Sequence, residues 1–467
     1  MHEPAITVYI PSHNYGKFLE QAIESVLRQT ESDWELLLID DNSSDNTREI
    51  MALYQGDPRI RLFHTNSIGL LGVANLALIE SRGKYFVRLD GDDYLDENAL
   101  MVMKSFLDRH PDSALVFPDF FLVDEQGNVL SLERRERLYE NNHMLDVPAN
   151  GACTMIRTEL LREAGGYRID VDAQDGLDLW LKMCRQHRCS NVNLPLFYYR
   201  RHGNNLTETT YRIYDARRYI KTQSIANVVD NYRPIIAVIP CRRLYDFHND
   251  LWNSQINGVS LLDLAIRKNI RSSLFDHIIV ASDNEDVIDT MNKFGDPRLV
   301  FHRRTTEETV RSRSIADTLS NIANRLDPER RGISLLNYVQ APFKTTQTLE
   351  EAVATLILNQ SDTAIAVREV KQTVFMRTAT GMRAVNPPSA LNSDFNAVYI
   401  ETFTTLATRN HILNRGSLIG ASVVNFVAPE QETYFIRTER DLQIARTLYA
   451  VEQDLVRKQD LARGIIA

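Results

Sequence analysis

The feature that most constrains the fold is a series of short apolar runs, each followed by a polar turn and an amphipathic segment. The first runs are Ile6–Ile10, Glu35–Ile39, Arg59–Phe63, Tyr85–Leu89 and Ala114–Phe117. Between them the apolar residues recur at the spacing of helices that pack on a sheet. Strands that alternate with helices in this way predict an α/β fold with a doubly wound, mostly parallel sheet.

A second series begins after a polar, helix-compatible stretch that lacks glycine and proline. Its apolar runs lie at Ile235–Ile239, His277–Ala281, Leu299–His302 and Ser334–Val339. A chain of 467 residues is also too long for one ordinary core. We therefore predict two doubly wound, mostly parallel α/β domains and a helical connection, with bounds at 1–207, 208–233 and 234–467.

Composition narrows the class of protein. With 43% hydrophobic and 25% charged residues, the chain resembles a soluble globular protein. The net charge of −9 argues against nucleic-acid binding, which normally needs a basic excess. The first residues lack the basic and apolar regions of a signal peptide, and no apolar run is long enough to span a membrane. Four cysteines without zinc-type spacing are expected to be free thiols. We predict a cytoplasmic protein.

Three carboxylates follow the apolar run that begins at Tyr85. Asp90, Asp92 and Asp93 come where the predicted strand leaves the sheet, and ligand crevices in open α/β sheets lie at the carboxyl ends of strands. Crowded acids repel each other unless a cation sits among them, and hard oxygen ligands select Mg²⁺ or Mn²⁺. The alternative is a solvated Asp-rich turn that caps the helix beginning near Asp96.

Acids also follow the strand Glu35–Ile39, at Asp40 and Asp41. Neighbouring parallel strands would bring both sets of acids to one crevice. A carboxylate there can accept the N–H of a base such as uracil, and the alternative for Asp41 is a turn that caps the next helix.

Two residues farther along the chain extend this pattern. Asp175 precedes a helix whose apolar face includes Trp180, so it is placed either to cap that helix or to act in the crevice. The stretch Phe197–Asn205 predicts a strand that ends in Arg200, Arg201 and His202, so His202 lies at a strand end. For His202 a structural role and a ligand role are equal alternatives.

Six motifs in order give residues from about 5 to 207 a resemblance to a known family. They are V-Y-I-P-S-H-N-Y, L-L-I-D-D-N-S-S-D-N-T, L-D-G-D-D, G-G-Y, Q-D-G-L-D-L-W-L and Y-R-R-H. This part of the chain resembles the family 2 glycosyltransferases, which are inverting enzymes with a GT-A fold. The resemblance implies a metal-dependent transfer of a sugar from a nucleotide-sugar donor, UDP-linked by preference, to a hydroxyl acceptor.

The resemblance also implies roles for single residues. Asp41 would read the base, and Pro11, His13 and Tyr15 would line the same pocket. Asp90 and Asp92 would bind the nucleotide-sugar, while Asp92, Asp93 and His202 would hold the Mn²⁺ or Mg²⁺ ion. Asp175 takes the position of the general base. Many family members have a glutamate before that base, whereas this chain has Gln174.

Residues from about 234 to 448 resemble the cytidylyltransferases that make CMP-activated acidic sugars. The matching stretches are V-I-P-C-R, N-G-V-S-L-L-D-L-A-I, L-F-D-H-I-I-V-A-S-D-N-E-D-V, Y-V-Q-A-P-F-K and T-E-R-D-L-Q-I-A. The family's phosphate-binding loop is rich in glycine and carries a lysine, but the stretch Arg242–Asn249 has neither. The family's metal-binding Asp-x-Asp corresponds to Phe435 and Arg437. We expect a catalytically inactive domain, in which Arg242, Arg243 and Lys344 retain the ability to bind an anion.

The leading hypothesis is thus a glycosyltransferase of polysaccharide or glycoconjugate synthesis with an inactive cytidylyltransferase-like domain. Its expected partners are a nucleotide-sugar donor and a glycan or lipid-linked acceptor, with no nucleic acid. Peripheral association with the inner membrane and a homo-oligomer formed through the C-terminal domain are further expectations. The alternatives are a bifunctional enzyme that also activates an acidic sugar with CTP, and a non-catalytic scaffold that binds sugar nucleotides.

Overall fold

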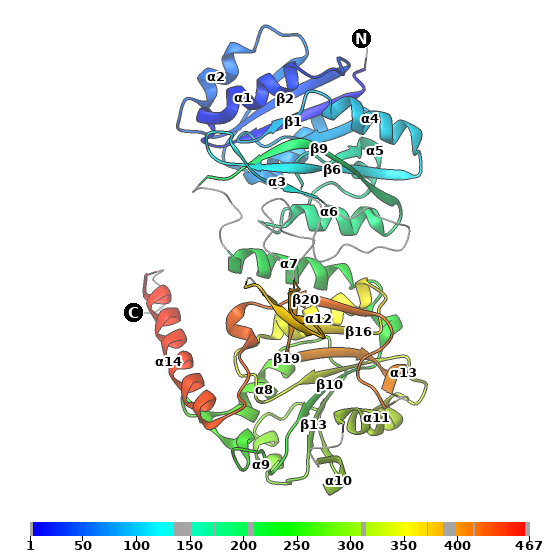
Figure 1. Ribbon diagram of the computed structural model, residues 1–467, viewed down its shortest axis with the longest axis vertical. Helices are drawn as coiled ribbons and strands as arrows, with labels where there is room; N and C mark the ends of the chain where they lie inside the picture. Colours follow the sequence, from blue (N-terminus) through cyan, green and yellow to red (C-terminus); the bar gives the residue numbers. More distant parts are fainter. Residues whose placement is uncertain are drawn as a thin grey trace. The chain divides into compact units, whose positions relative to one another are not determined.

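The computed structural model describes residues 3–134, 151–171, 173–202, 210–309, 314–370, 372–385, 398–413 and 416–462. The chain divides into two compact units, each built from α/β elements (Figure 1). Unit 1 comprises Met1–Ile220 and Val370–Val398, and unit 2 comprises Lys221–Glu369 and Tyr399–Ala467. Unit 1 therefore extends well into the segment that the sequence suggests as a connection.

Unit 1 is built on one large sheet with the strand order β3-β2-β1-β4-β8-β6-β9-β5, and β7 pairs with β6. The strands are β1 (Ile6–Ser12), β2 (Trp34–Asp41), β3 (Ile60–Thr65), β4 (Tyr85–Arg88), β5 (Tyr94–Leu95), β6 (Ser113–Val123), β7 (Val129–Glu133), β8 (Met155–Arg157) and β9 (Arg188–Arg200). The helices are α1 (Gly16–Leu27), α2 (Thr47–Leu53), α3 (Gly69–Glu80), α4 (Ala99–Arg109), α5 (Thr158–Glu163), α6 (Asp175–Cys184) and α7 (Thr210–Ser224). A separate hairpin pairs β17 (Phe375–Thr378) with β18 (Gly381–Ala384).

The strands β3, β2, β1 and β4 are parallel, as the apolar runs predict. Every residue of β1 and β2 is buried, because helices cover both faces of a parallel sheet and its strands need no polar face. The register sets Ser12 beside Asp40 and Tyr9 beside Arg88. The carboxyl ends of β1, β2 and β4 therefore lie along one edge of the sheet.

The structure shortens one predicted strand. The run G-A-C-T-M-I at Gly151–Ile156 predicts a strand, but β8 begins only at Met155, and Cys153 has a φ of 54°. The Cys153 N–H donates to the carbonyl of Arg88 at 2.7 Å, which draws this turn to the end of β4. The last strand, β9, ends at Arg200, within the predicted strand end at Arg200–His202, and residues 203–205 of that stretch lie outside the described residues.

Unit 2 contains a second sheet with the order β14-β13-β10-β15-β19-β16-β20. Its strands are β10 (Ile235–Pro240), β13 (His277–Ser282), β14 (Leu299–Arg303), β15 (Ile333–Asn337), β16 (Thr363–Val370), β19 (Val398–Arg409) and β20 (Val423–Val427), with β11 (Gln255–Ile256) and β12 (Val259–Ser260) apart. Its helices are α8 (Leu261–Ile270), α9 (Val287–Met291), α10 (Thr306–Thr309), α11 (Ile315–Leu326), α12 (Thr346–Leu358), α13 (Asn410–Leu413) and α14 (Glu439–Ala462), with 3₁₀ turns η2 (Val229–Tyr232), η3 (Leu251–Asn253) and η4 (Glu430–Thr433).

Two hydrophobic clusters cover the two faces of this sheet. Alternate residues of β10 supply them, since Ala237 belongs to the cluster with α8 and α12 while Val238 belongs to the cluster with α11. This confirms a second doubly wound α/β arrangement. Strand β19 runs antiparallel to β15. None of the helices in the described part of the chain has the length and apolar character required to cross a bilayer. All four cysteines are free thiols.

Candidate functional site

The acidic loop after β4 packs tightly against the turn that follows β1. Asp92 and Asp93 are buried, with exposed fractions of 5% and 1%. Gly91 makes this approach possible, because a Cβ there would lie 3.0 Å from Ser12 Oγ and 3.3 Å from Tyr15 Cβ. Burial, and after it the nearby Asp92 carboxylate, raises the pKa of Tyr15 well above its ordinary value. Tyr15 thus borders the acidic loop, and its predicted place in the nucleotide pocket stays a prediction.

His202 reaches the same loop from the end of β9. Its Nε2 lies 2.9 Å from Asp92 Oδ2, although the two residues are 110 positions apart in the chain. The imidazole stacks on the Phe18 ring, with 5.3 Å between ring centroids. The structure therefore brings together two of the predicted ligands, one on each of two strand ends.

Asp92 and His202 have the separation expected of two ligands on one ion. Adjacent ligands of an octahedral Mg²⁺ site with bonds of about 2.1 Å are about 3.0 Å apart. The observed 2.9 Å between Asp92 Oδ2 and His202 Nε2 matches that value. An oxygen and an imidazole nitrogen also suit Mn²⁺. The same 2.9 Å is a direct hydrogen-bonded contact between the imidazole and the carboxylate, and the pair could provide two of the ligands that a divalent ion needs.

Asp93 does not complete a three-ligand site. Among the described residues, no three His, Cys, Asp or Glu side chains gather in a way that could hold a metal. Asp93 Oδ1 instead accepts the backbone N–H of Arg200 at 2.8 Å, and burial raises its pKa well above the usual range. Its Oδ2 is buried without a hydrogen-bond partner. The geometry thus points one oxygen of Asp93 toward β9, and a role of Asp93 as a metal ligand stays a prediction.

Arg200 holds the acidic loop to the last strand, a role that the sequence analysis did not identify. Its Nε donates to the carbonyl of Asp92 at 2.8 Å, and its Nη2 donates to Gln21 Oε1 at 2.6 Å. The side chain is 2% exposed. A buried arginine needs such partners for its charge. Arg200 thereby sets the position from which His202 faces Asp92.

Arg88, the last residue of β4, connects the acidic loop to Asp175. Its Nε lies 2.9 Å from Asp90 Oδ1, and its Nη1 donates to Asp175 Oδ2 at 2.6 Å. Burial raises the pKa of Asp90 to about 6; the Arg88 charge opposes this rise and the Asp92 charge adds to it. The sequence analysis missed Arg88, although a charged residue inside an apolar strand was a usable signal.

Asp175 is the first residue of α6 and has one carboxylate oxygen on Arg88. The preceding Gln174 adopts a left-handed conformation with φ 63°, which is uncommon for a residue other than glycine and recurs at functional sites. The Asp175 side chain is 16% exposed, so the carboxylate is largely enclosed but reachable. One oxygen is thus anchored, and the other can meet a hydroxyl group.

Gly151 packs against the ion pair between Arg88 and Asp175. A Cβ at this position would lie 2.2 Å from Asp175 Oδ2 and 3.1 Å from Arg88 Nη2. We predict that Gly151→Ala displaces the carboxylate and lowers kcat by about 10²-fold, since a misplacement of about 1 Å can cost that much. Nucleotide binding should persist, because Asp92 and His202 are untouched. Steady-state kinetics with Gly56→Ala as control will test this, as a Cβ at Gly56 meets nothing within 4 Å. Unchanged kcat in Gly151→Ala would contradict it.

Asp41 is engaged in a different loop from the acids of β4. Its Oδ1 accepts the Thr65 hydroxyl at 2.5 Å and the Ile68 N–H at 2.8 Å, and its Oδ2 accepts the Gly69 N–H at 2.8 Å. These bonds tie β2 to the start of α3 and not to the next helix in the chain, α2, which the capping alternative named. His13 Nδ1 lies 2.7 Å from the carbonyl oxygen of Asp41, and Pro11 is buried in β1. A role of Asp41 in reading a base stays a prediction.

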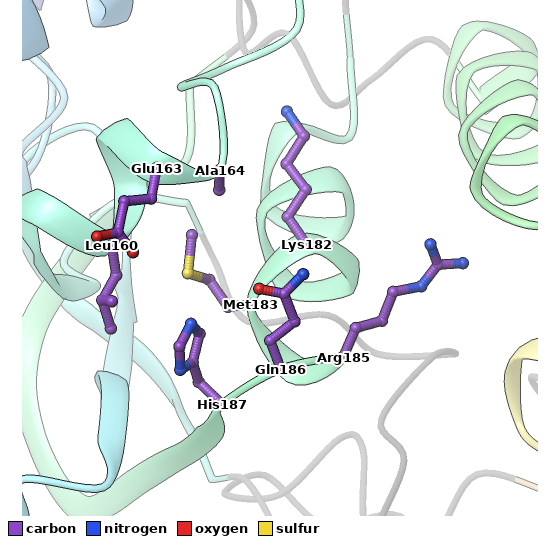
Figure 2. Close-up of a pocket in the computed structure, with 8 residues that line it drawn as sticks. All are labelled: Leu160, Glu163, Ala164, Lys182, Met183, Arg185, Gln186 and His187. Atoms are coloured by element: carbon purple, nitrogen blue, oxygen red, sulfur yellow. The ribbon is translucent and has the colours of Figure 1, made fainter. Parts of the chain in front are cut away.

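A pocket of about 210 Å³ lies between α5 and α6 (Figure 2). It is lined by residues such as Leu160, Lys182 and His187, and by none of the predicted site residues. Lys182 is occupied there, with its Nζ 2.7 Å from Asp178 Oδ2 and 2.9 Å from the carbonyl of Gly166. The candidate site is the set of charged contacts at the strand ends, and this pocket is not part of it.

In unit 2 the structure does not support Lys344 as a member of the predicted anion-binding set. Lys344 is 1% exposed and its Nζ donates to the carbonyl of Thr404 at 2.5 Å. Burial holds the pKa of Lys344 well below its ordinary value. Arg242 lies over the Tyr245 ring at 4.8 Å, and the Arg243 backbone N–H donates to Asp283 at 2.8 Å. A buried lysine with a reduced tendency to be charged is a poor anion ligand, which corrects the expectation for Lys344.

Two family models match the chain, one in each half. Residues 7–164 match glycosyl transferase family 2, and residues 254–455 match cytidylyltransferase. The chain therefore carries a family 2 glycosyltransferase domain followed by a cytidylyltransferase-like domain. The resemblances seen in the motifs are confirmed for both halves.

Individual proteins resemble the chain over part of their length. The chondroitin synthase of Escherichia coli is 23% identical over 245 residues, which cover 51% of this chain and 36% of the relative. The chain thus spans about a third of that relative's length. The solved structure of S. aureus TarS 1-349 in complex with UDP has 20% identity and a TM-score of 0.40, covering 48% of this chain and 65% of that one. The CMP:2-keto-3-deoxy-manno-octonic acid synthetase complexed with CTP has 15% identity and a TM-score of 0.36, covering 47% and 99%.

Proposed function

We propose that this protein transfers a sugar, with inversion, from a nucleotide-sugar to a hydroxyl group of an acceptor. The observation that supports it most is the double contact of Arg88. Arg88 contacts both Asp175, a candidate base, and Asp90 of the candidate donor site. It thereby joins two acids that are far apart in the chain. An inverting transfer needs this neighbourhood, because the acceptor must attack the sugar while the diphosphate departs.

This proposal assigns a binding role to each residue of the donor site. Asp90 and Asp92 bind the nucleotide-sugar, and Asp92 with His202 holds a divalent ion. When bound, that ion offsets the negative charge that develops on the departing diphosphate. Tyr15, Pro11 and His13 line the nucleotide pocket. Asp92 would thus serve both the donor and the ion, so we expect it to be the acid of the loop whose substitution has the largest effect.

Asp175 is the general base in this proposal. It removes the proton from the acceptor hydroxyl, whose oxygen attacks the anomeric carbon from the face opposite the diphosphate. The bond to the diphosphate breaks as the new glycosidic bond forms, so a single displacement inverts the configuration. No enzyme nucleophile is needed. Arg88 holds one oxygen of Asp175 and leaves the second for the acceptor.

The proposal also includes the donor and the setting of the reaction. A UDP-sugar and either Mn²⁺ or Mg²⁺ are implied by the family, and the domain bounds 1–207 and 234–467 belong to the proposal as predicted from the sequence. The chondroitin synthase relative makes polysaccharide synthesis a reasonable setting. A lipid-linked acceptor, a cytoplasmic location at a membrane surface and a homo-oligomer stay predictions.

Nucleotide release provides the test of this function. The full chain is incubated with UDP-sugars, with and without Mn²⁺, and released UDP is measured, first without and then with hydroxyl acceptors. We expect metal-dependent release that an acceptor accelerates. Absence of release with every nucleotide-sugar, despite tight UDP binding, would favour the scaffold hypothesis.

The cytidylyltransferase-like domain is expected to be inactive in the same preparation. Phe435 and Arg437 stand at the positions of the family's metal-binding acids, and Arg437 lies over the Phe435 ring at 5.4 Å. We therefore predict no pyrophosphate release from CTP with an acidic sugar and Mg²⁺, measured by a coupled phosphate assay. CTP-dependent pyrophosphate release would instead establish the bifunctional enzyme.

A further inference from the structure

Tyr9 is a residue with a polar end in the middle of a buried parallel strand. Its neighbours in β1, Val8 and Ile10, belong to the hydrophobic cluster on one face of the sheet. Because successive side chains of a strand alternate, Tyr9 points to the opposite face. There its ring stacks on Phe86 of β4 with 4.7 Å between the ring centroids, and the side chain is 0% exposed. A phenylalanine would make the same ring contact, so the hydroxyl group needs a separate explanation.

The Tyr9 hydroxyl is buried without a hydrogen bond. Among the described residues, none lies at hydrogen-bonding distance and angle from it. Buried tyrosine hydroxyls usually have a partner, as Tyr85 of β4 does, whose hydroxyl donates to Asp108 Oδ1 at 2.6 Å. A buried polar group without such a bond costs free energy of folding. The Tyr9 hydroxyl therefore makes the fold less stable, which points to a role outside folding.

Charged groups of the candidate site surround this hydroxyl. The register sets Tyr9 beside Arg88, which contacts both Asp175 and Asp90. Burial raises the pKa of Tyr9 well above its ordinary value; next in strength, Tyr167 raises this pKa, Arg88 lowers it and Asp175 raises it. Such electrostatic influence falls with distance, so these groups lie close to the hydroxyl. The hydroxyl thus keeps its proton and can donate to the Asp175 carboxylate.

Tyr167, on the other side of the Tyr9 hydroxyl, is fixed by a helix far away in the chain. The Asn75 side chain of α3 donates to the Tyr167 carbonyl at 2.8 Å and accepts the Tyr167 N–H at 2.9 Å. Gly166, with a φ of 68°, makes this approach possible, because a Cβ there would lie 2.6 Å from Asn75 Oδ1. The surroundings of the Tyr9 hydroxyl are therefore held in place by contacts between separate elements.

We propose that Tyr9 is a positioning residue for Asp175, and that its hydroxyl donates a hydrogen bond to the Asp175 carboxylate when the acceptor is bound. Hydrogen bonds of catalytic groups are often long or poorly aligned without substrate, and they tighten in the complex. A buried donor that has no partner without substrate, and that lies beside the candidate base, fits this behaviour. This role rests on the proposed function, in which Asp175 is the general base.

Tyr9→Phe tests the proposal, because it removes one oxygen atom and keeps the ring that stacks on Phe86. We expect kcat for acceptor-dependent UDP release to fall by about tenfold or more, the effect of losing a hydrogen bond to a charged group. The KM for the nucleotide-sugar and the affinity for UDP with Mn²⁺ should stay unchanged. The melting temperature should equal that of wild type or exceed it, since the variant loses a buried hydroxyl without a partner.

Tyr85→Phe is the matched control, because it removes a buried hydroxyl from the neighbouring strand that does have a partner. It should melt at a lower temperature than wild type and keep the wild-type kcat. A Tyr9→Phe variant with kcat within about threefold of wild type, less than one such hydrogen bond contributes, would overturn the proposal. So would a lower melting temperature of Tyr9→Phe, because the hydroxyl would then serve the fold. Absence of UDP release from wild type is a different result, which would reject the proposed function itself.

Discussion

Asp175→Asn is expected to lower kcat by about 10²–10⁴-fold, the usual contribution of a general base. The amide occupies nearly the same volume as the carboxylate but does not accept the proton of the acceptor hydroxyl. It also removes the charge that faces Arg88 Nη1 at 2.6 Å. Donor binding should change little, because the proposed ion ligands Asp92 and His202 lie on other elements.

Two measurements separate this outcome from a general defect. The turnover of wild type and Asp175→Asn is compared under saturating donor and acceptor, and UDP affinity is measured by calorimetry with Mn²⁺. Asp112→Asn, an exposed acid paired with Arg188 at 3.2 Å, is the control for the change of charge. Turnover within about threefold of wild type would be too small a loss for a general base, and would reject Asp175 in that role. Loss of UDP affinity alone would instead assign Asp175 to donor binding.

Asp92→Asn is expected to abolish metal-dependent binding of the nucleotide. A ligand present at 100 times its Kd stabilises the folded protein by about 2.7 kcal/mol, which is visible as a rise in melting temperature. Wild type with UDP and Mn²⁺ should show this rise, and the variant should not. Asp92 Oδ2 is the carboxylate atom that faces His202, and the substitution removes its charge.

Without ligand, the melting temperature of Asp92→Asn should respond in a different way. Asp92 helps to raise the pKa values of both Asp90 and Asp93, so its negative charge is unfavourable to its neighbours. Removing that charge should leave the melting temperature without ligand unchanged or higher. Asp57→Asn, which loses a surface pair with Arg59, is the control and should keep the response to UDP. A variant that melts lower without ligand, and still responds to UDP with Mn²⁺, would contradict the assignment.

Much of the fold could be predicted from the sequence. Fully buried parallel strands such as β1 and β2 produce continuous apolar runs, and these runs locate the strands without knowledge of their partners. The predictions failed where pairing decides the bounds. β8 is only three residues long and is antiparallel to both of its neighbours, so the local pattern around Gly151 did not reveal its beginning.

The residue types of the site could be predicted from the sequence, but most of their contacts could not. In the sequence, a carboxylate that faces a ligand from a strand end cannot be distinguished from one that binds a neighbouring loop. The structure turns Asp41 toward Thr65 and the start of α3, and turns Asp93 toward the backbone of Arg200. Asp92 faces His202 instead. These differences depend on side-chain direction in the assembled loops, which no local pattern reports.

The sequence by itself determined two α/β units, their order and the chemistry of their strand ends, because hydrophobic periodicity and acidic turns are local properties of the chain. Tertiary structure alone decided which of those groups meet. Arg88 touches Asp175 from 87 positions away, His202 touches Asp92 from 110, and Arg437 lies between Phe403 and Phe435. Such contacts arise when β4, β9 and β19 take their places in the sheets. Their physical reason is the register and burial of whole strands, which require all partners to be present at once.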